Sequence, residues 1–183
     1  QFRRVAKDNM YDWRVDFPGV LVPRYLRVEI DERIDAHGNI RTPLNEDSVH
    51  KAVAYLKKLK VESIVVSLLF SFLNPEHERA VAEIVKKDYP EASITLSSDV
   101  LPAVGEYERT STAIINAFIA PAIHKYTTQL TSLLEKEGFN GQFLYIQNNG
   151  GVETAEIAME KPATLAMSGP AAGPSAAITV GRL

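Results

Sequence analysis

The spacing of hydrophobic residues changes from segment to segment along the first half of the chain. In residues 25–32, apolar and charged side chains alternate, which predicts a half-buried strand. A turn at residues 37–39 and the pair at 40–41 predict a returning strand that completes a hairpin. Behind the N-cap residue Asn45, apolar residues repeat at helical spacing as far as Lys60. The pattern therefore predicts a hairpin followed by an amphipathic helix.

A strand, a helix and a second strand are predicted next. Residues 63–70 form a short, nearly continuous apolar run, which is typical of a strand buried on both faces of a parallel sheet. Asn74 is predicted to cap a helix whose first residue is Pro75, Pro90 ends this helix, and residues 94–96 provide the following strand. This order predicts a βαβ unit with a right-handed connection.

The stretch GEYERTSTAIINAFIAP, residues 105–121, predicts a helix with two unlike faces. One face is mainly apolar and is expected to lie in a core. It consists of Tyr107, Ser111, Ile114, Ile115, Phe118 and Ile119. The opposite face carries Glu106, Arg109 and Asn116 between alanines, so that another backbone or a ligand could approach closely. This polar face has two interpretations, a solvated pair at i,i+3 spacing or the lining of an interdomain cleft. Pro121 predicts the end of this helix and the start of a second one.

A glycine-bearing loop follows the strand predicted at residues 143–146. There Asn148 and Asn149 offer amide donors, while Gly150 and Gly151 allow a ligand to approach the backbone. Ligands of open α/β sheets bind beyond the carboxyl ends of strands, which favours a binding loop. The alternative is a plain turn built from good turn residues.

A second glycine-bearing loop is predicted after a strand at residues 163–167. It carries Ser168, Gly169 and Gly173 and leads into a small-residue helix at 175–180. A glycine-bearing turn before a helix N-terminus is suited to bind an anion. The alternative is close helix packing, for which small residues are equally suited.

Composition and charge narrow the function classes. The chain has 183 residues, no cysteine and a net charge of -3, which excludes disulfides and thiolate chemistry and gives no polyanion-binding signature. Residues 1–22 combine arginine with aromatic residues, but their aspartates cancel the charge, so no nucleic-acid partner is expected. No apolar run is long enough to span a membrane, and a cytoplasmic location is compatible with the absence of cysteine.

Charge is distributed unevenly between the two halves. Residues 1–91 hold 15 basic and 15 acidic side chains, whereas residues 92–183 hold 5 and 8. A half so poor in charge is expected to bury much of its surface, in its own core or against another surface.

Several well-known chemical motifs are absent from the sequence. There is no GxxxxGK[ST] loop, no GxGxxG fingerprint, no HExxH and no GxSxG. The four histidines are dispersed, so no metal site is predicted, and no nucleophile–base pair identifies a catalytic residue.

Three stretches together resemble the hydantoinase A/oxoprolinase family. They are GEYERTSTAIINAFIAP, LYIQNNGG and SGPAAG. The earlier stretches VPRYLRVEIDERIDAHGNIRTPL and VVSLLFSFLNPEHE resemble the N-terminal region of that family. The family includes N-methylhydantoinases, oxoprolinases and subunits of acetone and acetophenone carboxylases. The resemblance divides the chain into the remainder of the N-terminal region, residues 1–104, and the start of the ATPase-like region, residues 105–183.

The resemblance implies an α/β fold with a mixed, largely parallel sheet flanked by helices, as in part of the actin-like ATPase (ribonuclease H-like) fold. Members are expected to bind ATP and Mg²⁺ between two domains through loops of the form D-x-GG-T. Neither loop is in this sequence. The chain is therefore expected to be an internal piece that lacks both loops, binds no cofactor and does not turn over ATP by itself. Asn148 stands where the family usually has serine.

The resemblance also implies a reaction and partners. The parent protein is expected to use ATP to open a cyclic amide of the hydantoin or 5-oxoproline type through a phosphorylated intermediate. The alternatives are a ketone carboxylase subunit and a non-catalytic scaffold that holds a hydantoinase B-like partner in an oligomer. In the enzyme, Glu106, Arg109 and Asn116 would line or brace the cleft, and residues 148–151 and 168–173 would border it.

Overall fold

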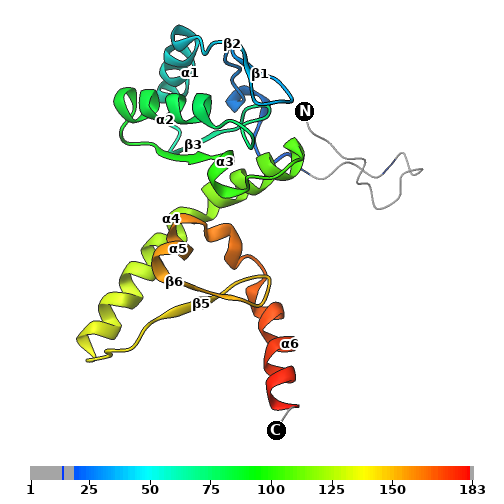
Figure 1. Cartoon of the computed structure of the whole chain (residues 1–183). Helices are drawn as coiled ribbons and strands as arrows, with labels where there is room; N and C mark the ends of the chain where they lie inside the picture. Colours follow the sequence, from blue (N-terminus) through cyan, green and yellow to red (C-terminus); the bar gives the residue numbers. More distant parts are fainter. Residues whose placement is uncertain (1–13, 15–18, 182–183) are drawn as a thin grey trace. The chain divides into compact units, whose positions relative to one another are not determined.

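The computed structural model describes Arg14 and residues 19–181 of the chain, without the side chains of Ser175 and Thr179. Most of the segment at residues 1–22 therefore lies outside the described residues. The chain divides into two compact units between Ile114 and Ile115, and each unit is described by itself (Figure 1).

The first unit is built around a βαβ motif. Strands β3 (Ser63–Val66) and β4 (Ser93–Leu96) pair in parallel, with Ile64 opposite Ile94, and helix α2 (Glu76–Asp88) connects them. Helix α1 (Glu46–Lys58) packs beside α2. This arrangement confirms the predicted strand–helix–strand order. The core consists of Val49, Val53, Ile64, Val66, Val81, Val85, Tyr89 and Ala92.

Local capping explains where the two helices of this unit begin. The side-chain oxygen of Asn45 accepts a hydrogen bond of 3.3 Å from the Ser48 amide, so Asn45 is the N-cap of α1 as predicted. Helix α2 begins at Glu76, one residue later than predicted, with Pro75 as its N-cap and not its first residue; the side-chain oxygen of Asn74 accepts a bond of 3.0 Å from the Glu76 amide. Both starts depend on side chains that are adjacent in sequence, which is why the pattern could predict them.

The prediction of a strand at residues 25–32 is wrong. A short 3₁₀ helix, η1 (Arg24–Leu26), opens this segment, and the residues after it, as far as Glu32, have no partner strand among the described residues. Its last part is held by the start of α1 instead. The Asp31 amide donates to the Ser48 hydroxyl at 3.1 Å, and the Asp31 carbonyl accepts from the Asn45 amide at 2.9 Å. The predicted hairpin forms further along, from β1 (Arg33–Ile34) and β2 (Ile40–Thr42).

Strand β3 is shorter than the apolar run that predicted it. It ends at Val66 because the next backbone groups are bonded to side chains. The Leu68 amide donates to Glu78 at 2.9 Å, and the Leu68 carbonyl accepts from Arg109 at 2.7 Å. A four-residue helix, α3 (Ser97–Val100), follows β4 directly.

Helix α4 (Glu106–Lys136) corrects the predicted break at Pro121. The helix continues through Pro121, although proline lacks the amide that would bond to the fourth residue before it. Side chains on both sides of the proline are anchored, Asn116 to backbone groups and Thr127 to the Tyr145 hydroxyl at 2.7 Å. Tertiary contacts therefore hold the helix where the local signal predicts its end.

The second unit contains an antiparallel hairpin of β5 (Leu144–Ile146) and β6 (Val152–Thr154), followed by helix α5 (Ala155–Glu160). Two predictions after α5 are wrong. The predicted strand at 163–167 is a 3₁₀ helix, η2 (Pro162–Leu165), and the predicted loop at Ser168 is already part of helix α6 (Ser168–Val180). Pro170 stands in the first turn of α6, where the backbone amides have no partner within the helix, so it does not prevent the helix from beginning at Ser168.

The fold class predicted from the sequence, mixed α/β, is confirmed. The described strands form three two-stranded sheets, of which β3–β4 is parallel and the other two are antiparallel. The sheets are thus smaller and more separate than the largely parallel sheet that the resemblance implied. Among the described residues, no helix is long and apolar enough to cross a membrane.

Candidate functional site

Arg109 is fully buried in the first unit. Its guanidinium donates to the Leu68 carbonyl at 2.7 Å, to the Ser97 hydroxyl at 3.1 Å and to the Ala103 carbonyl at 3.3 Å. It also lies over the ring of Phe72, 5.4 Å from its centre. At Arg109 the polar face of α4 is therefore packed against backbone. The small residues of this face predicted the close approach of either a backbone or a ligand, and here the neighbour is a backbone. Arg109 braces the first unit and is not exposed to a ligand there.

Glu78 provides the negative charge of the same buried cluster. Its carboxylate accepts hydrogen bonds from the Ser97 hydroxyl at 2.7 Å, from the Ser98 amide at 3.0 Å and from the Leu68 amide. The Ser97 hydroxyl links it to Arg109, which donates to the same oxygen. The cluster joins α2, α3 and α4 beyond the carboxyl ends of β3 and β4.

Asn116 is the corresponding buried residue of the second unit. Its side-chain oxygen accepts a hydrogen bond of 3.1 Å from the Ala163 amide, and its amide nitrogen donates to the Glu160 carbonyl at 3.5 Å. The side chain is only 3 % exposed. Asn116 thus holds the connection between α5 and η2. Glu106, the third member of the predicted polar face, is half-buried at the start of α4.

The QNNGG sequence forms the turn between β5 and β6. The Gln147 amide donates to the Gly151 carbonyl at 2.8 Å, and Gly150 has a φ of 83°, a conformation that favours glycine. A Cβ at Gly151 would lie 3.0 Å from the side-chain oxygen of Asn149, which would have to shift slightly, so the turn itself requires glycine only at Gly150. The side chain of Asn148 is exposed. The backbone is that of a plain turn, and its role in ligand binding stays a prediction.

A buried acid connects this turn to the segment before α6. The Glu153 carboxylate accepts from the Gln147 side-chain amide at 2.6 Å and from the Thr164 hydroxyl at 2.5 Å. The Asn148 amide donates to the Thr164 carbonyl at 2.7 Å. The turn is therefore fixed to a residue only four positions before Ser168, and the structure brings the two predicted glycine-bearing loops to neighbouring places within the second unit.

The second glycine-bearing segment is helical. Ser168 and Gly169 lie in the first turn of α6, where amides are available to an anion, whereas Gly173 lies further along the helix. A side chain added at Gly169 or Gly173 would meet no atom within 4 Å. Close packing of this helix against the described residues therefore does not explain these two glycines.

Glu156 lies beside the loops of the second unit, in the first turn of α5. The Glu156 backbone amide and the Thr154 hydroxyl hold the pKa of the Glu156 carboxyl below its ordinary value, at the start of α5. No group of three or more histidine, aspartate or glutamate side chains among the described residues is arranged to hold a metal ion.

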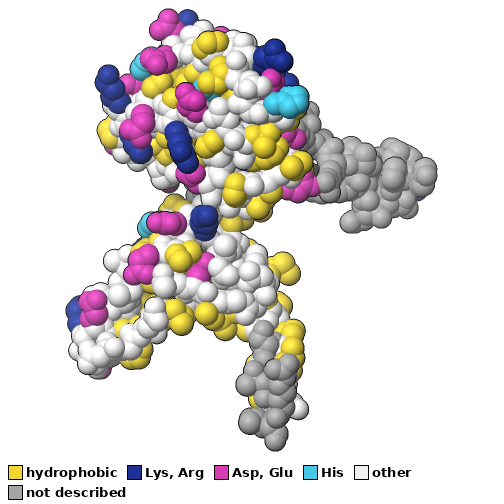
Figure 2. All heavy atoms as spheres, in the orientation of Figure 1, with side chains coloured by type: hydrophobic (Ala, Val, Ile, Leu, Met, Phe, Trp, Pro, Cys, Tyr) yellow, Lys and Arg dark blue, Asp and Glu magenta, His cyan; other side chains and the backbone are white. Residues whose placement is uncertain are grey.

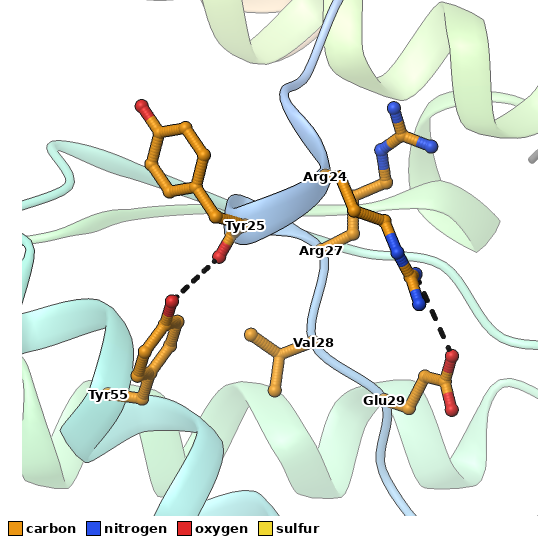
Figure 3. Close-up of a pocket in the computed structure, with 6 residues that line it drawn as sticks. All are labelled: Arg24, Tyr25, Arg27, Val28, Glu29 and Tyr55. Carbon is orange, nitrogen blue, oxygen red and sulfur yellow. Dashed lines mark hydrogen bonds and ion pairs between the residues drawn. The ribbon is translucent and has the colours of Figure 1, made fainter.

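Surface pockets lie elsewhere. One, of about 460 Å³, is lined by Arg24, Tyr25, Arg27, Val28, Glu29 and Tyr55 (Figure 3). The Tyr55 hydroxyl donates to the Tyr25 carbonyl at 3.1 Å beside it. Neither this pocket nor a second one of about 350 Å³ beside Glu32 and Ser67 includes any of the predicted site residues.

Comparison with protein families identifies the chain. The model of the hydantoinase/oxoprolinase N-terminal region matches residues 1–89, and the hydantoinase/oxoprolinase model matches residues 109–183. The chain belongs to the hydantoinase/oxoprolinase family. The resemblance stated from the sequence motifs is thereby confirmed.

Named relatives of this hydantoinase/oxoprolinase chain include two enzyme subunits. It is 32% identical to the caprolactamase subunit alpha of Pseudomonas jessenii over 98% of the chain and 26% of that protein. It is 35% identical to the acetophenone carboxylase gamma subunit of Aromatoleum aromaticum over 85% of the chain and 22% of that protein.

The fold is also similar to a solved structure. The ATP-dependent caprolactamase from Pseudomonas jessenii superposes with a TM-score of 0.85 at 32% identity, over 94% of this chain and 25% of that one. The chain thus spans about a quarter of the length of these relatives.

Sequence reasoning missed the buried acids Glu78 and Glu153. A signal for Glu78 existed, because it precedes Val81 and Val85 by three and seven residues and so shares their inward helix face. An acid on such a face requires hydrogen-bond donors. Glu153 lies on the face of its strand opposite to Val152 and Thr154, because side chains alternate along a strand. The neighbouring residues do not indicate which of the two faces is buried.

Proposed function

We propose that the polypeptide to which these residues belong is an ATP-dependent enzyme that opens a cyclic amide through a phosphorylated intermediate. The similarity to the ATP-dependent caprolactamase, in sequence over nearly the whole chain and in fold, supports this proposal most. Caprolactam, like hydantoin and 5-oxoproline, is a cyclic amide. Amides are poor electrophiles, and phosphorylation of the carbonyl oxygen converts that oxygen into a good leaving group.

In this proposal ATP and Mg²⁺ bind to the longer polypeptide, and the described residues contribute groups around them. The exposed Asn148 side chain and the first-turn amides at Ser168 and Gly169 are suited to hydrogen-bond a phosphate or carbonyl oxygen. Arg109, Asn116 and Glu153 act indirectly, because they are buried and hold backbone segments in place. The subunit names of the relatives favour a partner subunit, which we propose to be of the hydantoinase B type.

Isotope transfer tests the reaction. The longer polypeptide with its partner is incubated with ATP and a lactam that carries ¹⁸O at the carbonyl. Water attacks the carbon of the phosphorylated amide, and the ring nitrogen departs as the amine, which opens the ring and leaves an acyl phosphate. A second water that attacks the same carbon displaces phosphate, and the labelled oxygen leaves in the inorganic phosphate. Inorganic phosphate without label would exclude this route.

A ketone carboxylase subunit is the second candidate function. The 35% identity to the acetophenone carboxylase gamma subunit favours it. Phosphate release that requires acetone or acetophenone together with bicarbonate, and that no cyclic amide stimulates, would select this alternative. If neither a cyclic amide nor a ketone with bicarbonate stimulates phosphate release, the scaffold function would remain as the explanation.

The contribution of the turn is tested by Asn148→Ala in the same enzyme. We expect kcat/KM for ATP-dependent turnover to fall by about tenfold, the effect of losing one ordinary hydrogen bond. Asn140→Ala is the matched control, because Asn140 is also an exposed asparagine of the second unit. Equal kinetics of both variants and the unaltered enzyme would show that the turn does not contact the reactants.

A further inference from the structure

Helix α4 has an inverted distribution of polar and apolar residues in the second unit. Its buried side chains there are Asn116, Ala117 and Thr127. The exposed face carries large apolar residues instead. They are Ile115, Phe118, Tyr126 and Leu133. Phe118 is 84% exposed, and hydrophobic side chains are visible on the surface of both units (Figure 2).

These apolar side chains lie along one side of the helix, where the exposed Gln129 interrupts them between Tyr126 and Leu133. At 100° per residue they fall within a sector of about 80°, together with Ala122, which is also exposed. The stripe extends along about 27 Å of helix, since each residue adds about 1.5 Å. We call this set, Ile115, Phe118, Ala122, Tyr126 and Leu133, the α4 stripe.

The hairpin of the second unit shows the same inversion. Tyr145 and Glu153 are paired across the strands and face inward, where the Tyr145 hydroxyl bonds to Thr127. The aliphatic residues Leu144, Ile146 and Val152 are exposed. Two independent elements thus present their apolar faces outward.

The second unit consequently has almost no apolar core of its own. Among the described side chains from Ile115 onward, the buried apolar ones are Ala117, Ala158 and Pro162. A buried valine, leucine, isoleucine or phenylalanine contributes about 1.5–3 kcal/mol each, and this unit buries none within its described part. The described residues of this unit therefore leave much of its apolar surface uncovered.

We propose that the α4 stripe packs against an amphipathic helix from the same polypeptide, outside the 183 residues. The caprolactamase relative is about four times as long as this chain, so the polypeptide can supply such a helix. A core that a unit needs for folding is better supplied within its own chain than by a subunit that binds after folding. Ala122 in the middle of the stripe lets a second helix approach closely, and Lys125 is the one lysine, arginine or acid between residues 115 and 133.

Cysteine labelling tests this packing independently of any enzyme activity. The 183 residues contain no cysteine, so Ala122→Cys introduces a thiol whose labelled peptide is identified by mass spectrometry. Thr128→Cys is the matched control, because Thr128 is exposed on the same helix but outside the stripe. Both variants are prepared in the longer polypeptide, without partner subunit and at a concentration where light scattering shows single chains.

We expect maleimide to label Ala122→Cys at least about tenfold more slowly than Thr128→Cys in the longer polypeptide. In the 183-residue chain the two rates are expected to be similar. Equal rates in the isolated longer polypeptide would overturn the proposal. Protection that then appears only with the partner subunit, or only at concentrations where the chain dimerises, would assign the stripe to that other occupant.

A second variant covers the case in which cysteine at residue 122 disturbs packing. Phe118→Glu places a charge on the stripe, and Thr128→Glu places the same charge beside it. The proposal expects Phe118→Glu to lower the thermal midpoint of the isolated longer polypeptide by several degrees and Thr128→Glu to leave it unchanged. An unchanged midpoint for Phe118→Glu contradicts an intramolecular helix.

Discussion

Arg109 and Glu78 show how a buried charge is accommodated in this protein. The two side chains are fully buried, and the Ser97 hydroxyl accepts from one and donates to the other. Backbone groups at Leu68, Ser98 and Ala103 satisfy the remaining hydrogen-bonding capacity. Such a cluster fixes a unique arrangement of its elements, and the loss of one charge leaves the other without compensation.

Arg109→Met is therefore expected to be strongly destabilising. The loss should be about 3–5 kcal/mol in the free energy of unfolding, measured by urea denaturation of the 183-residue chain with circular dichroism. Arg24→Met is the control, because Arg24 is exposed and lies 4.0 Å from an exposed Glu29 carboxylate. Equal losses of unfolding free energy in the two variants would show that the buried cluster contributes no more to stability than an exposed ion pair.

Asp35 is the residue for which the structure gives a definite pH dependence. The backbone amides of Asn39 and His37, 2.9 Å from one carboxylate oxygen, lower the pKa of Asp35 to about 2. Arg41 adds a bond of 2.9 Å to the other oxygen. A carboxyl whose pKa is lower in the folded state stabilises that state above its ordinary pKa of 3.8.

The stabilisation by Asp35 should disappear as the pH falls from about 4 through 2. Asp35→Asn is expected to lower the unfolding midpoint at pH 5, and the difference from the unaltered chain should shrink as the pH approaches 2. Urea denaturation at a series of pH values measures this difference. A difference that stays constant or grows on acidification would exclude an ionised Asp35 as the stabilising group of the β1–β2 turn.

At the scale of elements, α4 contains a local conflict that its surroundings resolve. Pro121 removes one backbone hydrogen bond in the middle of the helix, yet the helix spans Glu106–Lys136. Asn116 and Thr127 anchor it on either side of the proline. The energetic penalty of the proline is consequently still present in the folded chain.

Replacement of that proline should stabilise the helix. Pro121→Ala restores the missing amide and is expected to raise the free energy of unfolding by about 1–3 kcal/mol in urea denaturation. Pro75→Ala serves as the comparison, because Pro75 precedes the first residue of α2 and removes no bond within the helix. That variant should change stability by less than about 1 kcal/mol. A gain from Pro75→Ala equal to that from Pro121→Ala would contradict this explanation.

At the scale of the whole molecule, the two units differ in how much apolar surface they bury. The first unit buries eight residues in one cluster around β3, whereas the second buries only alanine and proline among the apolar side chains of its described part. Stability is therefore expected to be unequal along the chain.

Hydrogen exchange measures this inequality. In the 183-residue chain, amides of α1, α2 and β3 should exchange at least about tenfold more slowly than amides of β5 and β6, after correction for intrinsic rates. Mass spectrometry of proteolytic peptides resolves the two groups. Equal protection of both would mean that the second unit has a source of stability other than the apolar burial described.

The sequence by itself determined the local elements and the family. Periodicity and capping residues specified α1, α2 and the βαβ order, because both signals involve neighbouring positions. The motifs GEYERTSTAIINAFIAP, LYIQNNGG and SGPAAG identified the family without any structure. Two local predictions failed. Helix α4 continues through Pro121, where a break was predicted, and residues 162–165 form a 3₁₀ helix where a strand was predicted.

Only the tertiary structure decided which face of α4 is inside. Amphipathic spacing predicted the apolar face for the core, but Arg109 and Asn116 are buried and Phe118 is exposed. The reason is that their partners, such as the carbonyl of Leu68 and the amide of Ala163, lie more than forty residues away in sequence. Periodicity separates two faces of a helix, and only the groups that reach each face determine which one is buried.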